Sequence, residues 1–236
     1  MGLIASLPMY DWPERRAEVD ADWAAIRDSL RERGVAAPQH LTRDVGSAAL
    51  SRRPDLLLSE TCWGPLELGL AEHVEVVGQP SYSGIEGGDG ELYSSAIVMR
   101  AVSGRRSADA TDVPTIPVEL LRGARFAFNG RDSMSGVISL TRDLEAVGES
   151  LDIFAQDTET GCHRRSLKAV AEGRADVAAI DCMSWHMAKR FESAARKLQV
   201  VGWTARRKGL PFITARSTPA PTVATLREAL SSLAAT

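Results

Sequence analysis

The chain has 236 residues, with 28 lysines and arginines against 31 aspartates and glutamates, and a net charge of −3. This length allows one large or two small domains and a sizeable core. With nearly equal numbers of basic and acidic residues, the chain lacks the excess positive charge that is typical of a nucleic-acid-binding protein. No run approaches the ~18 apolar residues of a membrane span, so membrane insertion is not expected.

The amino-terminal residues lack the basic segment and cleavage site of a signal peptide, because Met1 is followed almost at once by the strand-like run 3–7. A cytoplasmic location is therefore one expectation from the chain as given. Cys62, Cys162 and Cys182 are too few and too far apart for a disulfide framework, which fits a reducing compartment. Without paired metal-ligand spacing they are interpreted as small packed side chains, and no metal or cofactor is predicted.

The first eighty residues alternate between strand and helix patterns. A long helix ending at Gly34 has an apolar face, and a short helix is expected at 46–50. The expected strands are 3–7, 41–43, 56–59 and 74–77, and the helix face consists of Val19, Trp23, Ile26 and Leu30. Open α/β sheets bind ligands beyond the carboxyl ends of their strands, which makes Tyr10, after the first strand, a candidate contact. Simple loop packing is the alternative for an aromatic residue between prolines.

A turn-rich segment, 81–89, has tandem glycines but no Walker lysine after it, so it is expected to be a flexible loop. It leads into Tyr93-Ser94-Ser95 and a strand at 96–99, interpreted as the first crossover between two lobes. The polar, proline-containing stretch 103–117 is expected to be a surface excursion, followed by a short helix at 118–121.

Two strand-to-helix units follow. In the first, a strand at 125–129 precedes Ser133-Met134-Ser135-Gly136 at the start of a helix whose apolar face is Val137, Leu140, Leu144 and Val147. In the second, a helix stopped by Gly173 leads into a buried strand at 175–180 that ends at Asp181. The loop before that helix holds Thr160, Gly161 and His163, and a helix N-terminus with such donors favours an anion.

The remaining elements complete an α/β chain. A strand is expected at 151–154, and the run 200–202 is expected to return the chain to the first lobe, where a strand at 210–214 follows. A helix after Asp181 is expected to bury Met187, Phe191, Ala194 and Leu198, and a closing helix at 221–233 to bury Val223, Leu226, Leu230 and Leu233.

The motifs Tyr93-Ser94-Ser95, RFAFN, SMSG, TGCHRRS and GRADVAAID, in this order, resemble the phosphate, phosphite and phosphonate substrate-binding proteins of ABC importers. The resemblance is close from Tyr93 to Trp185. It implies a type II periplasmic-binding-protein fold: two α/β lobes, each a mostly parallel sheet flanked by helices, with two crossovers and a ligand cleft between the lobes. The expected lobes are 1–90 with 200–236, and 91–199.

The same resemblance implies a function and partners. The chain is expected to be a monomeric solute-binding protein that captures a small phosphorus oxyanion, with an ABC permease as partner and a periplasmic location. The ligand contacts implied in the second lobe are Tyr93, Ser95, Ser133, Met134, Ser135 and His163. By position alone, Thr61 and Trp63 are candidates from the first lobe.

Each of these residues also has a plainer interpretation. A serine at a helix start is by default an N-cap, a lone histidine is commonly structural, and Tyr93 can be a core aromatic. The sequence departs from the family at Met134, where a hydroxyl residue is common, and at Cys162, which replaces a serine. The preferred oxyanion can therefore differ.

Asp181 needs a separate explanation, because a carboxylate repels an anion. It must accept from a protonated ligand oxygen or an ammonium group, or hold a neighbouring donor. One hypothesis is therefore a phosphonate-like ligand with an amine or an acidic O–H. Two rival functions stay open: a cytosolic enzyme that uses Cys162, His163 and Asp181, and a ligand sensor on the same fold.

Overall fold

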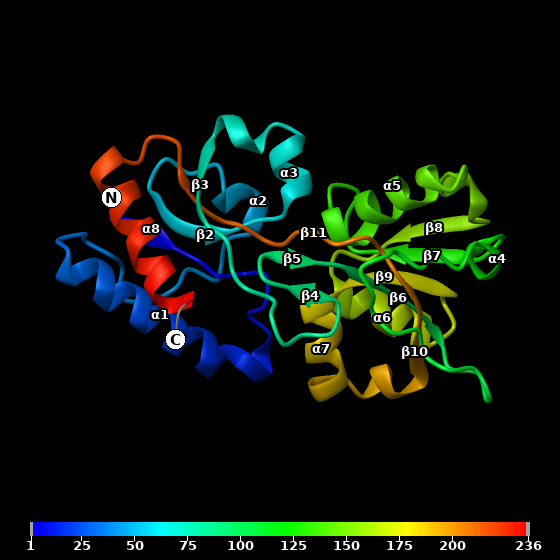
Figure 1. Ribbon diagram of the computed structural model, residues 1–236. Helices are drawn as coiled ribbons and strands as arrows, with labels where there is room; N and C mark the ends of the chain where they lie inside the picture. The colour runs from blue at the N-terminus through cyan, green and yellow to red at the C-terminus, as the bar shows by residue number, and fades with distance from the viewer. Residues whose placement is uncertain (1, 235–236) are drawn as a thin grey trace. The chain divides into compact units, whose positions relative to one another are not determined.

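The computed structural model describes residues 2–234, with side chains to residue 231. It divides into two compact units, unit 1 with residues 1–80 and 209–236 and unit 2 with residues 81–208. Each unit has its own sheet (Figure 1). Each also has its own apolar core. These limits differ from the expected lobes because residues 81–90 and 200–208 pair with strands of unit 2.

Unit 1 contains a four-stranded sheet in the order β1-β2-β12-β3. Strands β1 and β2 are parallel, whereas β12 is antiparallel to both of its neighbours. The strands are β1 (Ile4–Ala5), β2 (Leu56–Glu60), β3 (Val74–Gly78) and β12 (Phe212–Ala215). The helices are α1 (Arg16–Glu32), α2 (Ser47–Leu50), α3 (Trp63–Glu67) and α8 (Ala220–Ala234), with 3-10 turns η1 (Pro13–Arg15) and η2 (Leu70–Glu72).

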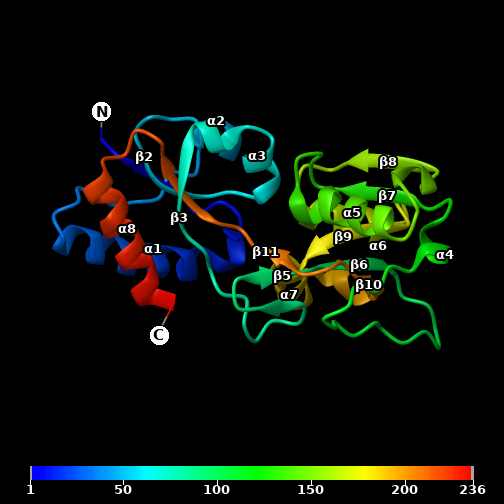
Figure 2. The same ribbon diagram turned by 45° about the horizontal axis from the view of Figure 1, so that its top comes forward.

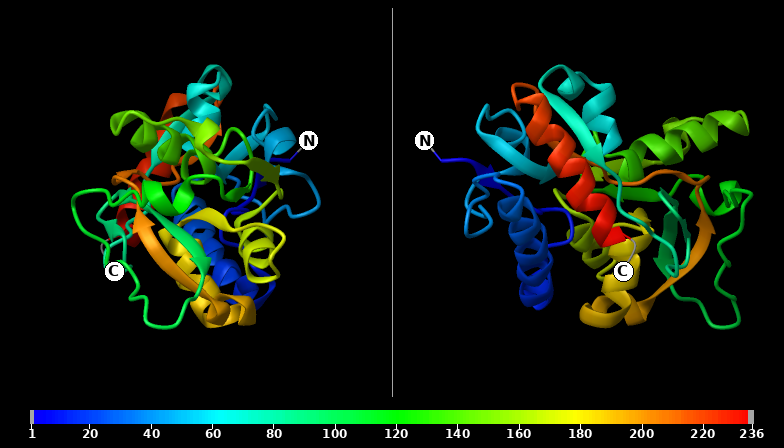
Figure 3. Two further views of the ribbon diagram at one scale, coloured as in Figure 1. Left: turned by 90° about the vertical axis from the view of Figure 1, so that its right-hand side faces the viewer. Right: turned by 60° about the vertical axis from the view of Figure 1, so that its left-hand side comes forward.

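The helical periodicity of unit 1 predicted its core. The predicted face of α1 is buried, and it shares a cluster with Leu57 and Leu58 of β2 and Leu226 of α8. Helices α1 and α8 contact each other, and α8 lies beside β3 (Figure 3). Val223 and Leu230 of α8 are also buried as predicted. Leu233 lies outside the residues whose side chains are described.

The strand predicted at 41–43 is not a strand. Thr42 makes one backbone bond to the Ala5 carbonyl, and its own carbonyl accepts from the Ser6 hydroxyl. One backbone hydrogen bond and one side-chain hydrogen bond do not make the repeated pairing of a β-ladder. This segment is therefore a loop that is hydrogen-bonded to Ala5 and Ser6.

Unit 2 contains a five-stranded sheet in the order β10-β6-β9-β7-β8 (Figure 2). Strand β6 is antiparallel to both neighbours, and β9, β7 and β8 are parallel. The strands are β6 (Ser95–Arg100), β7 (Arg125–Phe128), β8 (Gln156–Glu159), β9 (Val177–Asp181) and β10 (Leu198–Trp203). The helices are α4 (Val118–Leu121), α5 (Ser139–Ala146), α6 (His163–Ala171) and α7 (Cys182–Phe191), with short turns η3 (Met134–Ile138), η4 (Leu151–Ile153) and η5 (Ser193–Lys197).

The segment 81–89, expected to be a flexible loop, consists of turns that end in β4 (Gly88–Asp89), which forms a small sheet with β5 (Leu92–Tyr93) and β11 (Arg207–Lys208). Tyr82 stacks on Tyr93 with ring centroids 5.4 Å apart. Gly87 is needed here, since a Cβ at this position would meet the Trp203 ring at 2.4 Å. Aromatic packing therefore connects this turn-rich segment to the rest of unit 2.

Three further expectations in unit 2 were wrong. Residues 151–153 form a 3-10 turn capped by Ser150, and the strand follows as β8, whose side chains are all exposed. Helix α7 ends at Phe191, because Glu192 accepts from the Ala194 amide and starts η5; Leu198 then opens β10. Val147 is 55% exposed and lies past the end of α5 rather than in its buried face.

The topology of unit 2 gathers chain segments at one sheet edge, called here the carboxyl edge. The parallel strands β7, β8 and β9 all end there, and β6 begins there because it runs antiparallel. The loops that follow β7 and β8 and the start of α7 therefore share this edge with Ser95. Among residues 2–234, no helix is long and apolar enough to span a membrane.

Candidate functional site

The first loop at the carboxyl edge connects β7 to η3. Ser133 is extended and caps the turn by accepting from the Gly136 amide at 3.0 Å, so the N-cap interpretation of this serine holds. Ser135 lies two residues later, with its hydroxyl oxygen 3.5 Å from that of Ser133. Both serines are more than 95% buried, which places two hydroxyl groups in a protected position at a helix start.

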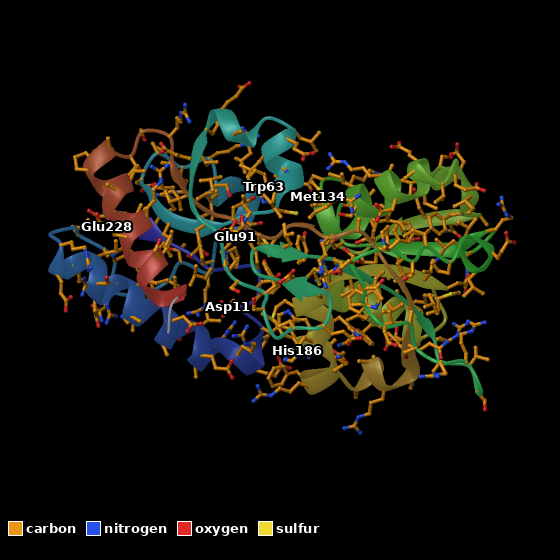
Figure 4. All side chains as sticks on the ribbon, in the orientation of Figure 1. Asp11, Trp63, Glu91, Met134, His186 and Glu228 are labelled. Atoms are coloured by element: carbon orange, nitrogen blue, oxygen red, sulfur yellow. The ribbon has the colours of Figure 1, made fainter. Side chains whose placement is uncertain are left out.

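The first turn of this helix is a π turn. The Ser133 carbonyl accepts from the Val137 amide at 3.2 Å and from the Ile138 amide at 3.1 Å, so the turn holds one residue more than an α-turn. The first amide groups of a helix have no intrahelical acceptor, and a π turn is common at functional sites. Met134, labelled in Figure 4, is buried in this turn and its sulfur contacts Arg142 Nη1.

The second loop connects β8 to α6. The position of Thr160 is fixed by two hydrogen bonds of its hydroxyl group. The hydroxyl donates to the Phe128 carbonyl at 2.9 Å and pairs with the Ser166 hydroxyl at 2.7 Å. Gly161 has φ of +87°, a conformation that favours glycine. Cys162 precedes the helix without a side-chain capping bond. The Cys162 side chain therefore leaves the first amide groups and the positive dipole end of α6 uncapped.

His163, the first residue of α6, joins the two loops. Its Nε2 lies 2.9 Å from the Ser135 hydroxyl oxygen and 3.3 Å from Asp181 Oδ2. Burial lowers the pKa of His163, and the Asp181 carboxylate and the Ala179 carbonyl oppose that shift. The sequence-predicted serine, histidine and aspartate are thus in contact with one another.

Asp181 has a structural role at the end of β9. Its Oδ1 accepts from the Ser184 amide at 2.8 Å and so caps α7, while Oδ2 faces His163. Of the roles considered for this carboxylate, holding neighbouring donors is the one present in this structure. Because the same nitrogen of His163 faces both Ser135 and Asp181, the three residues do not form a Ser–His–Asp relay, which needs both ring nitrogens.

Ser95 lies directly opposite Asp181 in the β6–β9 register. Its amide donates to the buried Thr204 hydroxyl at 2.8 Å, and its carbonyl accepts from the Thr204 amide. Thr204 was missed from the sequence, where nothing distinguishes it from other polar loop residues. Tyr93, two residues before Ser95, is 98% buried and stacked on Tyr82, so it is also part of the aromatic packing of unit 2.

The other sequence candidates lie in unit 1. Tyr10 is in the loop after β1, Thr61 is buried directly after β2, and Trp63 opens α3. Sequence reasoning missed Glu60, the last residue of β2, which is 92% buried and accepts from the Met9 amide at 3.2 Å. Burial raises the pKa of Glu60 to about 7. Glu60 could have been identified from the sequence by the pattern that identified Asp181, a charged residue at the end of an apolar strand.

The three cysteines have different surroundings. Cys162 is exposed, contrary to the packed interpretation, whereas Cys62 is partly buried and Cys182 is buried. Burial, reinforced by the Asp181 carboxylate, raises the pKa of the Cys182 thiol and makes it a poor nucleophile. Within residues 2–234, no cluster of three histidine, cysteine or acidic side chains is arranged to hold a metal ion.

Solved structures with low sequence identity have this fold. PhnD1 of Prochlorococcus marinus, solved with methylphosphonate, is 14% identical with a TM-score of 0.70 over 96% of this chain and 83% of its own. A binding component of a Pseudomonas aeruginosa phosphonate transporter is 16% identical, with a TM-score of 0.66 over 96% and 73%. A Xanthomonas citri protein bound to ATP is 16% identical, with a TM-score of 0.65 over 99% and 84%.

No curated protein sequence matches the chain. The family model of the periplasmic substrate-binding proteins of phosphonate ABC transporters matches residues 67–236, which is more than half of the chain and includes both loops of the carboxyl edge. Together with the type II periplasmic-binding-protein fold of the two units, this match means that the chain belongs to the family of periplasmic substrate-binding proteins of phosphonate ABC transporters.

Proposed function

We propose that the chain binds a small phosphorus oxyanion, a phosphonate, phosphite or phosphate, at the carboxyl edge of unit 2. The observation that carries this proposal is the convergence of two helix starts there, with the buried Ser135 hydroxyl 2.9 Å from Nε2 of His163. Hydroxyls, first-turn amides and an imidazole are donors, and helix N-termini favour anions.

The ligand set is argued from the same contacts. Ser133, Ser135 and His163 supply side-chain donors, and the main chain at Met134 supplies an amide. Ser95 lies opposite Asp181 in the β6–β9 register and Tyr93 precedes it on β5, while Tyr10, Thr61 and Trp63 are the candidates of unit 1. Asp181 orients His163 and, for a ligand with an ammonium group or an acidic O–H, also accepts from it.

The proposal is binding without catalysis. A nucleophilic mechanism needs an activated thiol or hydroxyl. The arrangement at Nε2 of His163 offers no relay to Ser135, and among the described residues the Cys162 sulfur makes no hydrogen bond to His163 or Asp181. Family membership supports a permease partner and a periplasmic location, which we propose together with the binding function.

A thermal-shift screen tests this function, with phosphate, phosphite, methylphosphonate and aminoethylphosphonate as ligands and sulfate and carboxylates as controls. A ligand at a hundred times its Kd stabilises the folded state by about 2.7 kcal/mol. Stabilisation by one phosphorus oxyanion, lost in His163→Ala and Ser133→Ala, is the expected result. If none of the phosphorus compounds changed the melting temperature of the protein, the proposal would be wrong.

A further inference from the structure

Asn129 is the only asparagine in the chain, and it directly follows the last residue of β7 at the carboxyl edge. The loop from Asn129 leads through Gly130, whose carbonyl accepts from the Ser133 amide at 3.1 Å, to the cap of the π turn. Asn129 therefore lies on the same loop as Ser133 and Ser135, although nothing in its sequence pattern indicates a ligand.

The carboxamide of Asn129 is held against Gly136. A Cβ at Gly136 would lie 1.9 Å from Asn129 Oδ1 and 3.1 Å from the Ser133 hydroxyl oxygen. The hydrogen that Gly136 has in place of that Cβ therefore points at Oδ1, which makes a Cα–H···O contact. The orientation of the amide follows, because the opposite one would direct N–H hydrogens at that C–H group.

The two ends of this amide have unequal surroundings. Oδ1 is buried without a hydrogen-bond partner, whereas the residue as a whole is partly exposed. In the described part of the chain, Nδ2 of Asn129 also donates to no protein acceptor. An amide with its oxygen blocked and its nitrogen unpaired offers two donors and no usable acceptor.

We infer that Asn129 is a further ligand-binding residue, whose Nδ2 donates to an ionised oxygen of the oxyanion held by the π turn. The inference rests on the proposed function and deepens it. It also accounts for Met134, since the Asn129 amide adds a neutral donor to a turn that lacks the hydroxyl common in the family. Gly136 is then a positioning residue, because any side chain there would displace the amide.

The single asparagine permits a direct test. Protein labelled with ¹⁵N at asparagine alone has one side-chain NH₂ pair, which is followed by NMR during titration with the oxyanion that gives the largest thermal shift. We expect both NH₂ signals to move on saturation. Asn129→Ala should weaken binding about tenfold to hundredfold, the range for one hydrogen bond to a charged group.

The second variant, Asn129→Asp, keeps the shape of the amide and replaces its donors by a charge, so its loss should exceed that of Asn129→Ala. Gln156→Glu is the matched control, with the same charge change at an exposed residue that pairs with Arg125 at the opposite edge of the sheet. Its affinity should stay within twofold of the parent, and a comparable loss there would indicate a nonspecific charge effect and overturn the inference.

The two levels of the proposal fail differently. If no phosphorus oxyanion stabilises the parent protein, the proposed function fails and the role of Asn129 fails with it. If an oxyanion binds, the NH₂ signals stay in place and both Asn129 variants bind within twofold of the parent, only the role of Asn129 is wrong.

Discussion

Two ionisable side chains with little exposure, the buried Glu60 in unit 1 and the partly buried His163 in unit 2, have pKa values displaced in opposite directions by the same cause. Burial disfavours the charged form of each, so it raises the pKa of the carboxyl group to about 7 and lowers that of the imidazole. For Glu60 the Met9 amide and Arg15 oppose the rise, and Asp11 and Asp22 add to it. Both side chains therefore couple folding to pH near neutrality.

Replacing Glu60 by glutamine should flatten the pH dependence of stability. The folded state binds the Glu60 proton more tightly than the unfolded state, whose carboxyl group has its ordinary pKa of 4.5. Its contribution is therefore greatest below pH 4.5 and is lost as pH rises through about 7, by about 3 kcal/mol in total. Urea unfolding of parent and Glu60→Gln at pH 5 and pH 8 measures this difference.

The comparison with the parent is necessary because His163 acts in the opposite sense. Its lowered pKa means that the unfolded state binds the proton more tightly, so its contribution falls as pH drops through 6.5. Subtracting the parent curve removes this term. An unchanged slope between pH 5 and pH 8 in Glu60→Gln would show that the carboxyl group is not protonated preferentially in the folded protein.

At the scale of elements, the Ser133 cap and the π turn that follows it determine where unit 2 places its hydrogen-bond donors. Ser133 binds the Gly136 amide with its hydroxyl and two later amides with its carbonyl. The same residue therefore starts the helix and supplies a proposed ligand contact. Structural and binding roles can be separated by comparison with another serine cap in the same unit.

Ser133→Ala should lose both stability and affinity, whereas Ser150→Ala should lose stability alone. Ser150 caps η4 by accepting from the Asp152 amide at 3.1 Å, and it lies on an exposed turn before β8. Loss of such a cap costs about 1 kcal/mol. Chemical denaturation and ligand titration of both variants give the two quantities. Equal loss of affinity in both variants would indicate that the effect of Ser133 arises only from destabilisation.

For the molecule as a whole, the carboxyl edge of unit 2 is the region where ligand binding should alter backbone dynamics. Hydrogen exchange should slow in segments 130–137 and 160–166 when a phosphorus oxyanion is present. The slowing should approach a hundredfold at a hundred times Kd, provided that exchange requires opening of the bound site. Mass spectrometry of peptic fragments measures this. Slowing confined to the amino ends of β7 and β8 would place the ligand elsewhere.

Much of this architecture follows from local patterns. The apolar faces of α1 and α8 and the buried run of β9 were predicted, because burial imposes a period of 3.6 on a surface helix and continuous apolarity on a central strand. Strand β8 left no such pattern: its side chains are exposed, and backbone pairing with β7 alone makes it a strand. The end of α7 was missed because Glu192 stops the helix through a side-chain bond that periodicity does not report.

The residues of the candidate site divide in the same way. Ser133, Ser135, His163 and Asp181 were predicted because helix starts and strand ends are visible along the chain, and α/β topology places them at one edge. Whether they touch was not predictable, since the shared contact at Nε2 of His163 depends on three segments folding together. The contact between Asn129 and Gly136 was not predictable either, although both residues belong to one loop, because it depends on how that loop folds back at the π turn. Local sequence reports propensity and burial, whereas the position of an unpaired donor depends on the folded path of the backbone around it.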